Sequence, residues 1–498
     1  MRPFLALLPL DDRPASLVFP RQIAQIAGLD LLLPPRTTLG HFKKPGNPAL
    51  AGEWLQKAAD HSMALLVSTE MLVYGGLYAS RYPQISLKTA LQNLSTLEEI
   101  HRKHPDLPIL AAGLIMRHTV SAAGAGSARV YEALMRYTEL KDLVEIQGKF
   151  EYNQELSTIR NSIPPEVIFD YHEARLRNHQ VNLRLLEYLA GGALQGLILL
   201  QDDSRPAGLH RLEQQALLEQ GTRLGIADRF HICPGGDEGA LDLLALWLNS
   251  KQPLQCELRF TSLEGAQQIA DYEDRPIHET VTGHFHAANV VKVQQNAGLV
   301  FWVHTPSSIL EVERAAAEIT HLIHAGKLVA LADVRFPNGS DPSLLERLCA
   351  SGLIPHLAAY AGWNTAGNSI GAAIAQASAW WTAVSHVPTQ QQLQAQLLFL
   401  WQRIVDDWGY QRVIRQPLEA RSIQEGKDVL DLGSSAPEVR KEIEILLTRW
   451  SNQTWRGGQW KGIPPTLSIS LPWGRTFEIE LKLKKNQRYE DWFQTGNI

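Results

Sequence analysis

The chain has 498 residues, of which 45% are hydrophobic and 20% are charged, and its formal net charge is −5 at pH 7. Such a chain can bury a sizeable core and is expected to form two to four domains, or one large α/β barrel with additions. Its acidic and basic residues are interspersed, without the basic stripe that nucleic acid requires, so nucleic acid is excluded as an expected partner.

The cysteine content and the first residues bear on localisation. Cys233, Cys256 and Cys349 lie far apart, which indicates neither a disulfide framework nor a cysteine-based zinc motif and fits a reducing compartment. The apolar stretch 1–10 is too short for a signal peptide, and no apolar run approaches the roughly 18 residues of a membrane span. We therefore expect a cytoplasmic protein with no membrane association.

The first half of the chain alternates between strand and helix patterns. Apolar runs predict strands at 4–10, 30–33, 63–67, 108–115, 194–200 and 230–233. Apolar spacings of three and four predict helices at 16–27, 49–60, 87–104, 207–224 and 240–249, and a largely helical region from about 124 to 192. This alternation is typical of a parallel sheet or barrel.

Shorter units follow in the second half. Strands are predicted at 254–261, 290–293, 299–303, 328–331 and 354–360. Helices are predicted at 309–325, 390–408 and 438–450. Period-two alternation at 466–471 and 476–483, around a Pro-Trp-Gly turn, predicts a β-hairpin.

These elements predict an α/β fold. We expect a (β/α) barrel-like catalytic core over residues 1–385, with a further boundary near residue 250, and a helical region with a small β-hairpin over residues 386–498. Two doubly wound α/β domains that divide near residue 250 are the alternative.

Paired carboxylates follow two of the predicted strands. Asp202 and Asp203 follow strand 194–200, and Glu238 follows strand 230–233 after two glycines. Ligands of α/β folds bind at the carboxyl ends of parallel strands, and two carboxyl groups in different environments can divide acid and base roles. Asp202, Asp203 and Glu238 are therefore the predicted catalytic residues, although capping of the following helices is the alternative. Because strand side chains alternate, only one of the two aspartates, with Asp203 slightly favoured, is expected to face the site.

Further polar and aromatic residues at strand ends are predicted to bind the substrate. An aromatic ring beside amides suits a sugar, because the ring stacks on C–H groups while the amides bond hydroxyls. Helix capping, ion pairing and turn formation are the alternative roles for these side chains. The predicted substrate-binding residues are Asp11, Asp12, Arg13, Glu70, Tyr74, Arg117, Asp237, Asp333, Asn338, Trp363, Asn364 and Asn368.

One histidine cluster raises the question of a metal. His278, His284 and His286 are close in sequence, and His284 and His286 would share a face on a strand. The region is predicted to be helical, where residues two apart diverge. We therefore predict no metal and no other cofactor.

Several segments together resemble a bacterial family of uncharacterised proteins, domain-of-unknown-function family 4127. They are Leu-Leu-Pro-Leu-Asp-Asp-Arg-Pro at 7–14, Tyr-Gly-Gly-Leu at 74–77, Gln-Asp-Asp at 201–203, Gly-Gly-Asp-Glu at 235–238 and Tyr-Ala-Gly-Trp-Asn-Thr at 360–365. The resemblance spans most of the chain and implies no activity.

Two shorter similarities point to glycosidases that act on N-acetylhexosamines. The Gly-Gly-Asp-Glu segment is similar to one at a barrel strand end in one such family, where the glutamate is the general acid. The pair Asp202-Asp203 and the segment Trp363-Asn364 resemble the O-GlcNAc-hydrolase family. Both similarities imply a barrel with carboxylates at its strand ends.

The predicted function is that of a glycoside hydrolase-like enzyme. Strand-end carboxylates would cleave a glycosidic bond by acid/base catalysis, with a small carbohydrate as partner and an N-acetylated amino sugar as the candidate substrate. A metal-dependent hydrolase that uses His278, His284 and His286 is one alternative. A non-catalytic sugar- or nucleotide-binding α/β protein is the other.

Overall fold

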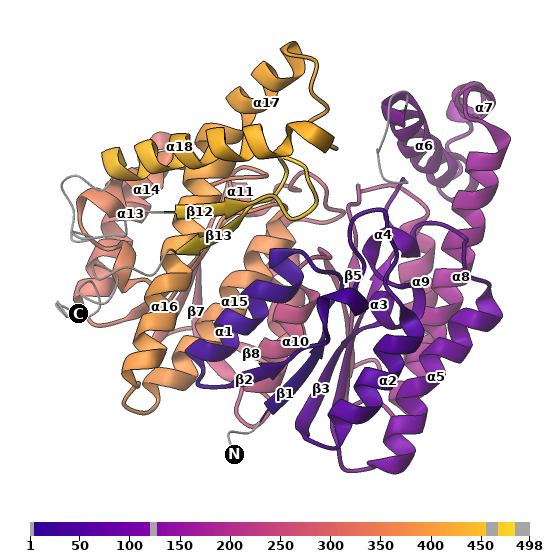
Figure 1. Cartoon of the computed structure of the whole chain (residues 1–498), viewed down its shortest axis with the longest axis horizontal. Helices are drawn as coiled ribbons and strands as arrows, with labels where there is room; N and C mark the ends of the chain where they lie inside the picture. The colour runs from indigo at the N-terminus through magenta and orange to yellow at the C-terminus, as the bar shows by residue number, and fades with distance from the viewer. Residues whose placement is uncertain (1–3, 120–126, 455–466, 484–498) are drawn as a thin grey trace.

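The computed structural model describes residues 4–119, 127–454 and 467–483. These residues form two open parallel sheets, surrounded by helices, and one small antiparallel pair of strands (Figure 1). The α/β class predicted from the sequence is therefore confirmed. Among the described residues, no helix is both long and apolar enough to cross a membrane.

The first sheet uses the strands of the first half of the chain. In spatial order they are β2 (Asp30–Leu32), β1 (Phe4–Leu8), β3 (Ser62–Ser68), β4 (Ile109–Ile115), β5 (Gly196–Gln201) and β6 (Phe230–Pro234). All neighbours pair in parallel. Every residue of β4 and β5 is buried, which explains why these strands are continuous apolar runs rather than alternating ones.

The second sheet uses the strands after residue 250. In spatial order they are β11 (Ala359–Ala361), β10 (Leu328–Asp333), β9 (Leu299–His304), β7 (Leu254–Phe260) and β8 (Val290–Val293), again all parallel. Numbered along the chain within each sheet, five strands of both sheets follow the order 2-1-3-4-5. This is the order of doubly wound folds, in which the chain reverses direction between the first and second crossovers.

The predicted barrel does not form in the described part of the chain. Strands β2 and β6 lie at opposite edges of the first sheet, and β8 and β11 at opposite edges of the second. The first sheet ends at Pro234 and the second begins at Leu254. The domain boundary near residue 250 stays a prediction. Alternating strand and helix patterns are common to barrels and open sheets, so the sequence pattern could not separate them.

Helices cover both faces of each sheet. The outer face of the first sheet packs against α2 (Pro48–Ala59), α3 (Thr69–Tyr74), α5 (Leu87–Lys103), α8 (Pro165–Ala190) and α9 (His210–Arg223). The layer between the sheets contains α1 (Phe19–Ile26), α10 (Gly239–Leu248), α12 (Ile277–Ala287) and α15 (Ala366–Val384). The outer face of the second sheet packs against α13 (Ile309–His324), α14 (Pro342–Ala350), α16 (Gln390–Arg403), α17 (Arg415–Gln424) and α18 (Ala436–Thr454).

Smaller elements complete the fold. Helices α6 (Ser127–Lys141) and α7 (Asn153–Ser162) pack with the start of α8 in a separate cluster, and α4 (Leu77–Ser80) and α11 (Leu263–Ala266) are single turns. Helix α16 continues as a π-helical segment, Ile404–Ile414. Strands β12 (Leu467–Ser470) and β13 (Glu480–Leu483) form the predicted hairpin. The separation of residues 386–498 as a region of its own stays a prediction.

Candidate functional site

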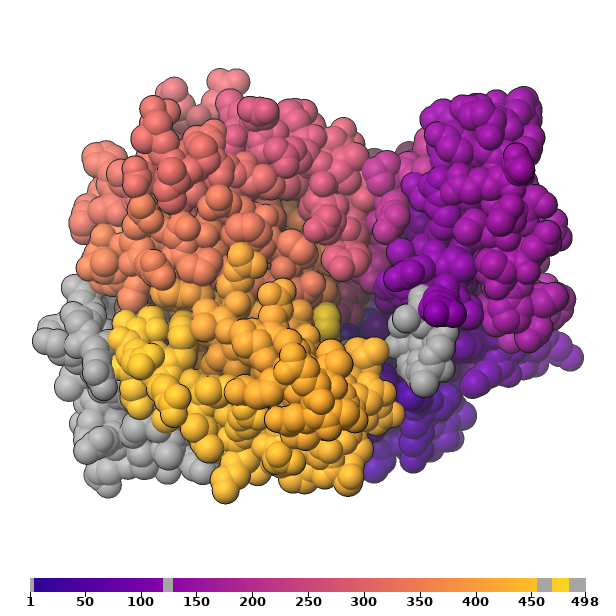
Figure 2. All heavy atoms as spheres, turned by 90° about the horizontal axis from the view of Figure 1, so that it is seen from above, coloured from indigo at the N-terminus to yellow at the C-terminus, as the bar shows by residue number. Residues whose placement is uncertain are grey.

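A cavity of about 310 Å³ lies where the carboxyl ends of the first sheet meet loops from the second half of the chain. Figure 2 shows the molecule from above, relative to the view of Figure 1. The yellow-orange C-terminal helices lie on one side in this view, and the purple helices α6 to α8 lie on the other. The polar and aromatic side chains of the lining are Arg13, Phe42, Tyr78, Arg81, Arg117, Tyr131, Asp202, Asp203, Asp237, Tyr272, Asn338, Asn364, Thr365, Asn368, Trp473, Arg475 and Phe477.

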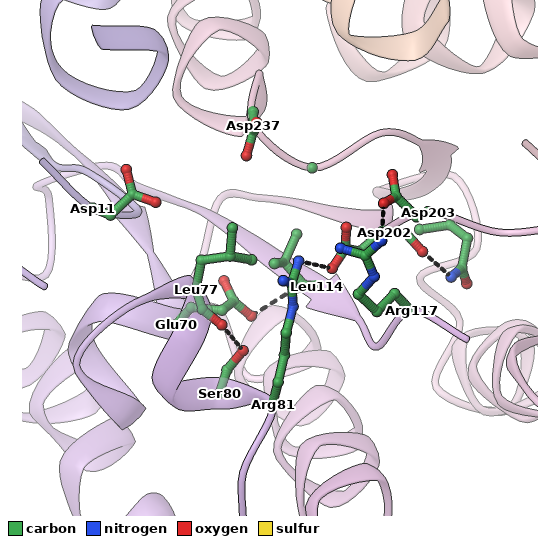
Figure 3. Close-up of polar contacts among 12 residues, drawn as sticks. Asp11, Glu70, Leu77, Ser80, Arg81, Leu114, Arg117, Asp202, Asp203 and Asp237 are labelled. Carbon is green, nitrogen blue, oxygen red and sulfur yellow. Dashed lines mark hydrogen bonds and ion pairs between the residues drawn. The ribbon is translucent and has the colours of Figure 1, made fainter. Parts of the chain in front are cut away.

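Both aspartates after β5 line this cavity. Strand β5 ends at Gln201, so Asp202 and Asp203 lie in the following loop, where strand alternation no longer applies. The expectation that only one of them faces the site is therefore wrong. Arg81 donates to Asp202 at 2.6 Å, and Arg117 donates to Asp203 (Figure 3). The Asp203 side chain remains 29% exposed and that of Asp202 13%.

The two aspartates have pKa values shifted in opposite directions. Burial raises the pKa of Asp203 above its ordinary value, and the neighbouring Asp202 adds to this while Arg117 opposes it. Burial also acts to raise the pKa of Asp202, but Arg81 and Arg117 together hold it below its ordinary value. Asp202 is thus the member that stays ionised, and Asp203 is the member that more readily carries a proton.

Arg13 and Asp237 form the opposite wall of the cavity. The Arg13 guanidinium donates to both carboxylate oxygens of Asp237, at 3.0 and 2.6 Å, and to Asp11 at 2.9 and 2.7 Å. The Asn364 amide also donates to Asp237, at 3.2 Å. Because Asn364 follows β11, this contact connects the strand ends of the two sheets.

The turn of the C-terminal hairpin closes one side of the cavity. Trp473 donates its indole N–H to Asp12 at 2.8 Å, and its ring lies 4.6 Å from the Arg13 guanidinium carbon. Arg475 packs against the rings of Trp473 and Phe477, at 4.7 and 5.2 Å. The sequence pattern predicted this hairpin, but nothing local in it predicts contact with a strand end 461 residues away.

Eight predicted residues therefore line the cavity: Arg13, Arg117, Asp202, Asp203, Asp237, Asn338, Asn364 and Asn368. Seven others do not: Asp11, Asp12, Glu70, Tyr74, Glu238, Asp333 and Trp363. The other polar and aromatic lining residues were not predicted: Phe42, Tyr78, Arg81, Tyr131, Tyr272, Thr365, Trp473, Arg475 and Phe477. Of these, Arg81 had a usable signal, since it closely follows the glycine pair Gly75-Gly76 after β3.

Three predicted residues that do not line the cavity contact the backbone or side chains around it. Glu70 accepts the backbone N–H of Leu114 at 2.8 Å, and burial raises the pKa of Glu70 to about 7 (Figure 3). Asp333 accepts the N–H of Asp341 at 2.6 Å and so fixes the loop that carries Asn338. Tyr74 lies beneath Arg177, whose guanidinium carbon is 4.4 Å from its ring.

One comparison with known proteins decides the family. A family described as protein of unknown function, DUF4127, matches residues 5–482. The chain belongs to the DUF4127 family. The resemblance predicted from the sequence is thereby confirmed, and every residue of the cavity lies within the matched part. No curated protein matches the chain, so the similarity to glycosidases rests on the short segments alone.

The histidines of this DUF4127 chain diverge, as expected on a helix. His278 contacts the Ala266 carbonyl at 3.0 Å, and the His286 ring lies beside that of His231. Only His284 meets acidic side chains: it lies with Glu238 and Asp242 in a fully buried group. Among the described residues, this group is the one whose ligand atoms are spaced closely enough to hold a metal ion.

Proposed function

We propose that this protein hydrolyses a glycosidic bond in a small polar sugar bound in the cavity, with Asp203 as general acid and Asp202 as the ionised partner. The observation that carries the proposal is the pair of adjacent cavity carboxyl groups with pKa values shifted in opposite directions. Such a pair can divide acid and base roles between two chemically identical groups. The protonated Asp203 would donate to the leaving oxygen, and water would complete the hydrolysis.

The rest of the lining supports a sugar as the ligand. Tyr78, which is only partly buried, offers an aromatic face, and Asn338 and Asn364 offer amide groups that can donate to and accept from hydroxyls. A volume of about 310 Å³ is at the small end of ligand pockets and suits one or two sugar rings. For an N-acetylated sugar, the ionised Asp202 would orient the acetamido group while Asp203 protonates the leaving oxygen.

A second candidate function is sugar binding without catalysis. It is favoured by the fact that each aspartate of the cavity is ion-paired with an arginine. Paired in this way, the carboxylates would act as fixed hydrogen-bond acceptors for hydroxyl groups rather than as proton donors. The open doubly wound sheets also occur in many proteins that only bind their ligand.

The test is a screen of the full chain against aryl glycosides, N-acetylhexosaminides included, followed by kinetics of the Asp203→Asn variant. We expect Asp203→Asn to lower kcat by at least about 100-fold, because general acid catalysis contributes about 10²–10⁴-fold. Circular dichroism and the unfolding midpoint should stay near those of the wild type. Asp228→Asn, at an exposed position before β6, is the matched control and should keep full activity.

Two results would decide against catalysis by Asp203. Near-wild-type turnover of Asp203→Asn on a confirmed substrate would remove its assigned role. Calorimetric binding of a sugar by the wild type, with no release of aglycone from any tested glycoside of that sugar, would favour the binding protein instead.

A further inference from the structure

Below the cavity floor lies a buried acidic group that the proposed function does not use. Glu238 and Asp242 are at the start of α10 and in its first turn, four residues apart and therefore on one face of the helix. His284, on α12, reaches them from the second half of the chain. All three side chains are fully buried.

Each of the two carboxyl groups has one oxygen that accepts no hydrogen bond within the described part of the chain and has only the His284 ring near it. Oε2 of Glu238 accepts the Gly236 N–H at 2.8 Å, but within the described part of the chain Oε1 of Glu238 and Oδ2 of Asp242 have no hydrogen-bond partner. The nearby buried Glu273 differs, since Thr280 donates to one of its oxygens at 2.8 Å and Gly367 to the other at 2.5 Å. An unpartnered buried carboxylate oxygen is costly and calls for a specific occupant.

One ring nitrogen of His284 faces the same pair of carboxyl groups. Nε2 of His284 lies 2.9 Å from the Pro234 carbonyl, which can only accept, so Nε2 carries the hydrogen in that contact. Nδ1 faces Asp242, at 3.4 Å from Oδ1 and 3.3 Å from Oδ2, and without a metal ion it can donate a hydrogen to that carboxylate. A metal ion bound at Nδ1 would take the place of that hydrogen. A histidine that donates one N–H to a backbone carbonyl and turns the other nitrogen inward is the usual arrangement of a metal ligand.

Charge and spacing both fit a divalent ion. With a metal ion bound, two ionised carboxylates and a neutral imidazole would carry a charge of −2, which one dication neutralises in this buried site. The three ligand atoms lie within 4.8 Å of one another. Bonds of about 2.0–2.2 Å to zinc imply ligand atoms about 3.3–3.5 Å apart, and Nδ1 of His284 and Oδ2 of Asp242 are already 3.3 Å apart. Oε1 of Glu238 lies 3.9 Å from Nε2, the other ring nitrogen, so the Glu238 carboxyl group would have to turn to complete the site.

We propose that Glu238, Asp242 and His284 form a binding site for one divalent transition-metal ion, with Zn²⁺ as the best match to a nitrogen and two carboxylate oxygens. The ion would fasten α10 to α12 beneath the loop that presents Asp237 to the cavity. Gly371 of α15 closes the group, since a Cβ there would lie 2.7 Å from both Asp242 Oδ1 and Glu238 Cγ. This proposal is independent of the sugar chemistry assigned to the cavity.

The test is metal analysis of the purified full chain, followed by calorimetric titration with Zn²⁺ after chelation and dialysis. We expect about one Zn²⁺ per chain, and a loss of affinity of more than about 100-fold in His284→Gln and in Asp242→Asn, since even outer contacts of metal sites contribute about 10–100-fold. His286→Gln, on the same helix but outside the group, is the control and should bind as the wild type does.

A measurement on the wild type covers the case in which those variants do not fold. Co²⁺ in place of Zn²⁺ should give one strongly shifted, exchangeable imidazole N–H proton signal, from the Nε2–H of His284. Uptake of neither Zn²⁺ nor Co²⁺ by the wild type would overturn the proposal and leave protons as the occupants of the group. Unchanged Zn²⁺ affinity in folded His284→Gln, or more than one shifted N–H signal, would also overturn it.

Discussion

At the scale of single residues, arginine side chains set the state of the cavity. Asp237 shows this most clearly, because Arg13 donates to both of its oxygens and is itself buried. Removing one partner of such a pair leaves a buried charge uncompensated, at a cost of about 3–5 kcal/mol. Of the pair Asp202 and Asp203, Asp203 is the more exposed and the one whose burial raises its pKa, so it is the more accessible candidate for a proton donor.

Glu70 gives a prediction about pH at the same scale. Its pKa of about 7 in the folded protein exceeds the ordinary 4.5 because the side chain is buried. The folded state therefore keeps a proton that the unfolded state has lost, and stability should fall as pH rises from about 4.5 to 7. The Glu70→Gln variant can still accept the Leu114 N–H but has no ionisable group at this position. Its stability should therefore not show this fall between pH 4.5 and 7.

Urea unfolding at pH 5 and pH 8 measures the effect. Between these pH values, the free energy of unfolding of the wild type should fall by about 2–3 kcal/mol more than that of Glu70→Gln, because each pKa unit corresponds to about 1.4 kcal/mol. Glu219→Gln, at an exposed position, should change nothing. An identical pH dependence in wild type and Glu70→Gln would show that Glu70 ionises normally in the folded protein.

At the scale of elements, local patterns were sufficient for most strands but not for their assembly. Apolar runs predicted β4 and β5 within two residues of their bounds, because both faces of these two strands are buried. Strand β8 was predicted at its exact bounds, although two of its four residues are exposed. Helices α14 and α17 were missed. The open sheets could not be separated from a barrel, because the edge strands are distinguished only by partners distant in sequence.

The candidate site was predictable to the extent that it is built from strand ends. Asp202, Asp203 and Asp237 directly follow buried strands, and parallel strands bring such positions together. Trp473 and Arg475 belong to a hairpin near the end of the chain, and only the tertiary packing brings them to the cavity. Glu238 carries the same local signal as Asp237 but points away from the cavity into its buried group.

The hairpin turn supports a prediction at this scale. Trp473 is 6% exposed and contacts Asp12 and Arg13, so Trp473→Ala should remove both packing and a hydrogen bond. We expect a loss of about 3 kcal/mol in the free energy of unfolding. Trp473→Phe, which keeps the ring but not the N–H, should lose only about 1–2 kcal/mol. If the unfolding curves of both variants overlay the wild-type curve, the Trp473 side chain does not hold the turn in place.

At the scale of the whole molecule, the two sheets share one hydrophobic core. Side chains of β1, β4 and β5 and side chains of β9 and β10 belong to the same buried cluster, which α1, α10, α12 and α15 fill from between the sheets. Figure 1 shows α10 and α15 side by side in this layer. Neither sheet can bury its inner face without these helices, and the helices come from both halves of the chain. The two sheets are therefore expected to unfold together, unlike domains joined only by a linker.

Hydrogen exchange in increasing urea tests this coupling through Leu55. Leu55 of α2 is fully buried against the outer face of the first sheet, in a cluster that contains no residue of the second sheet. If the shared layer couples the sheets, Leu55→Ala should lower the exchange free energy of amides in β4 and in β9 by the same amount, about 2–5 kcal/mol. If the exchange free energy falls for amides in β4 but stays at its wild-type value for amides in β9, each sheet unfolds with its own outer helices instead. The equal loss is expected because opening the first sheet would expose the inner faces of α10 and α15, and with them the apolar support of β9 and β10.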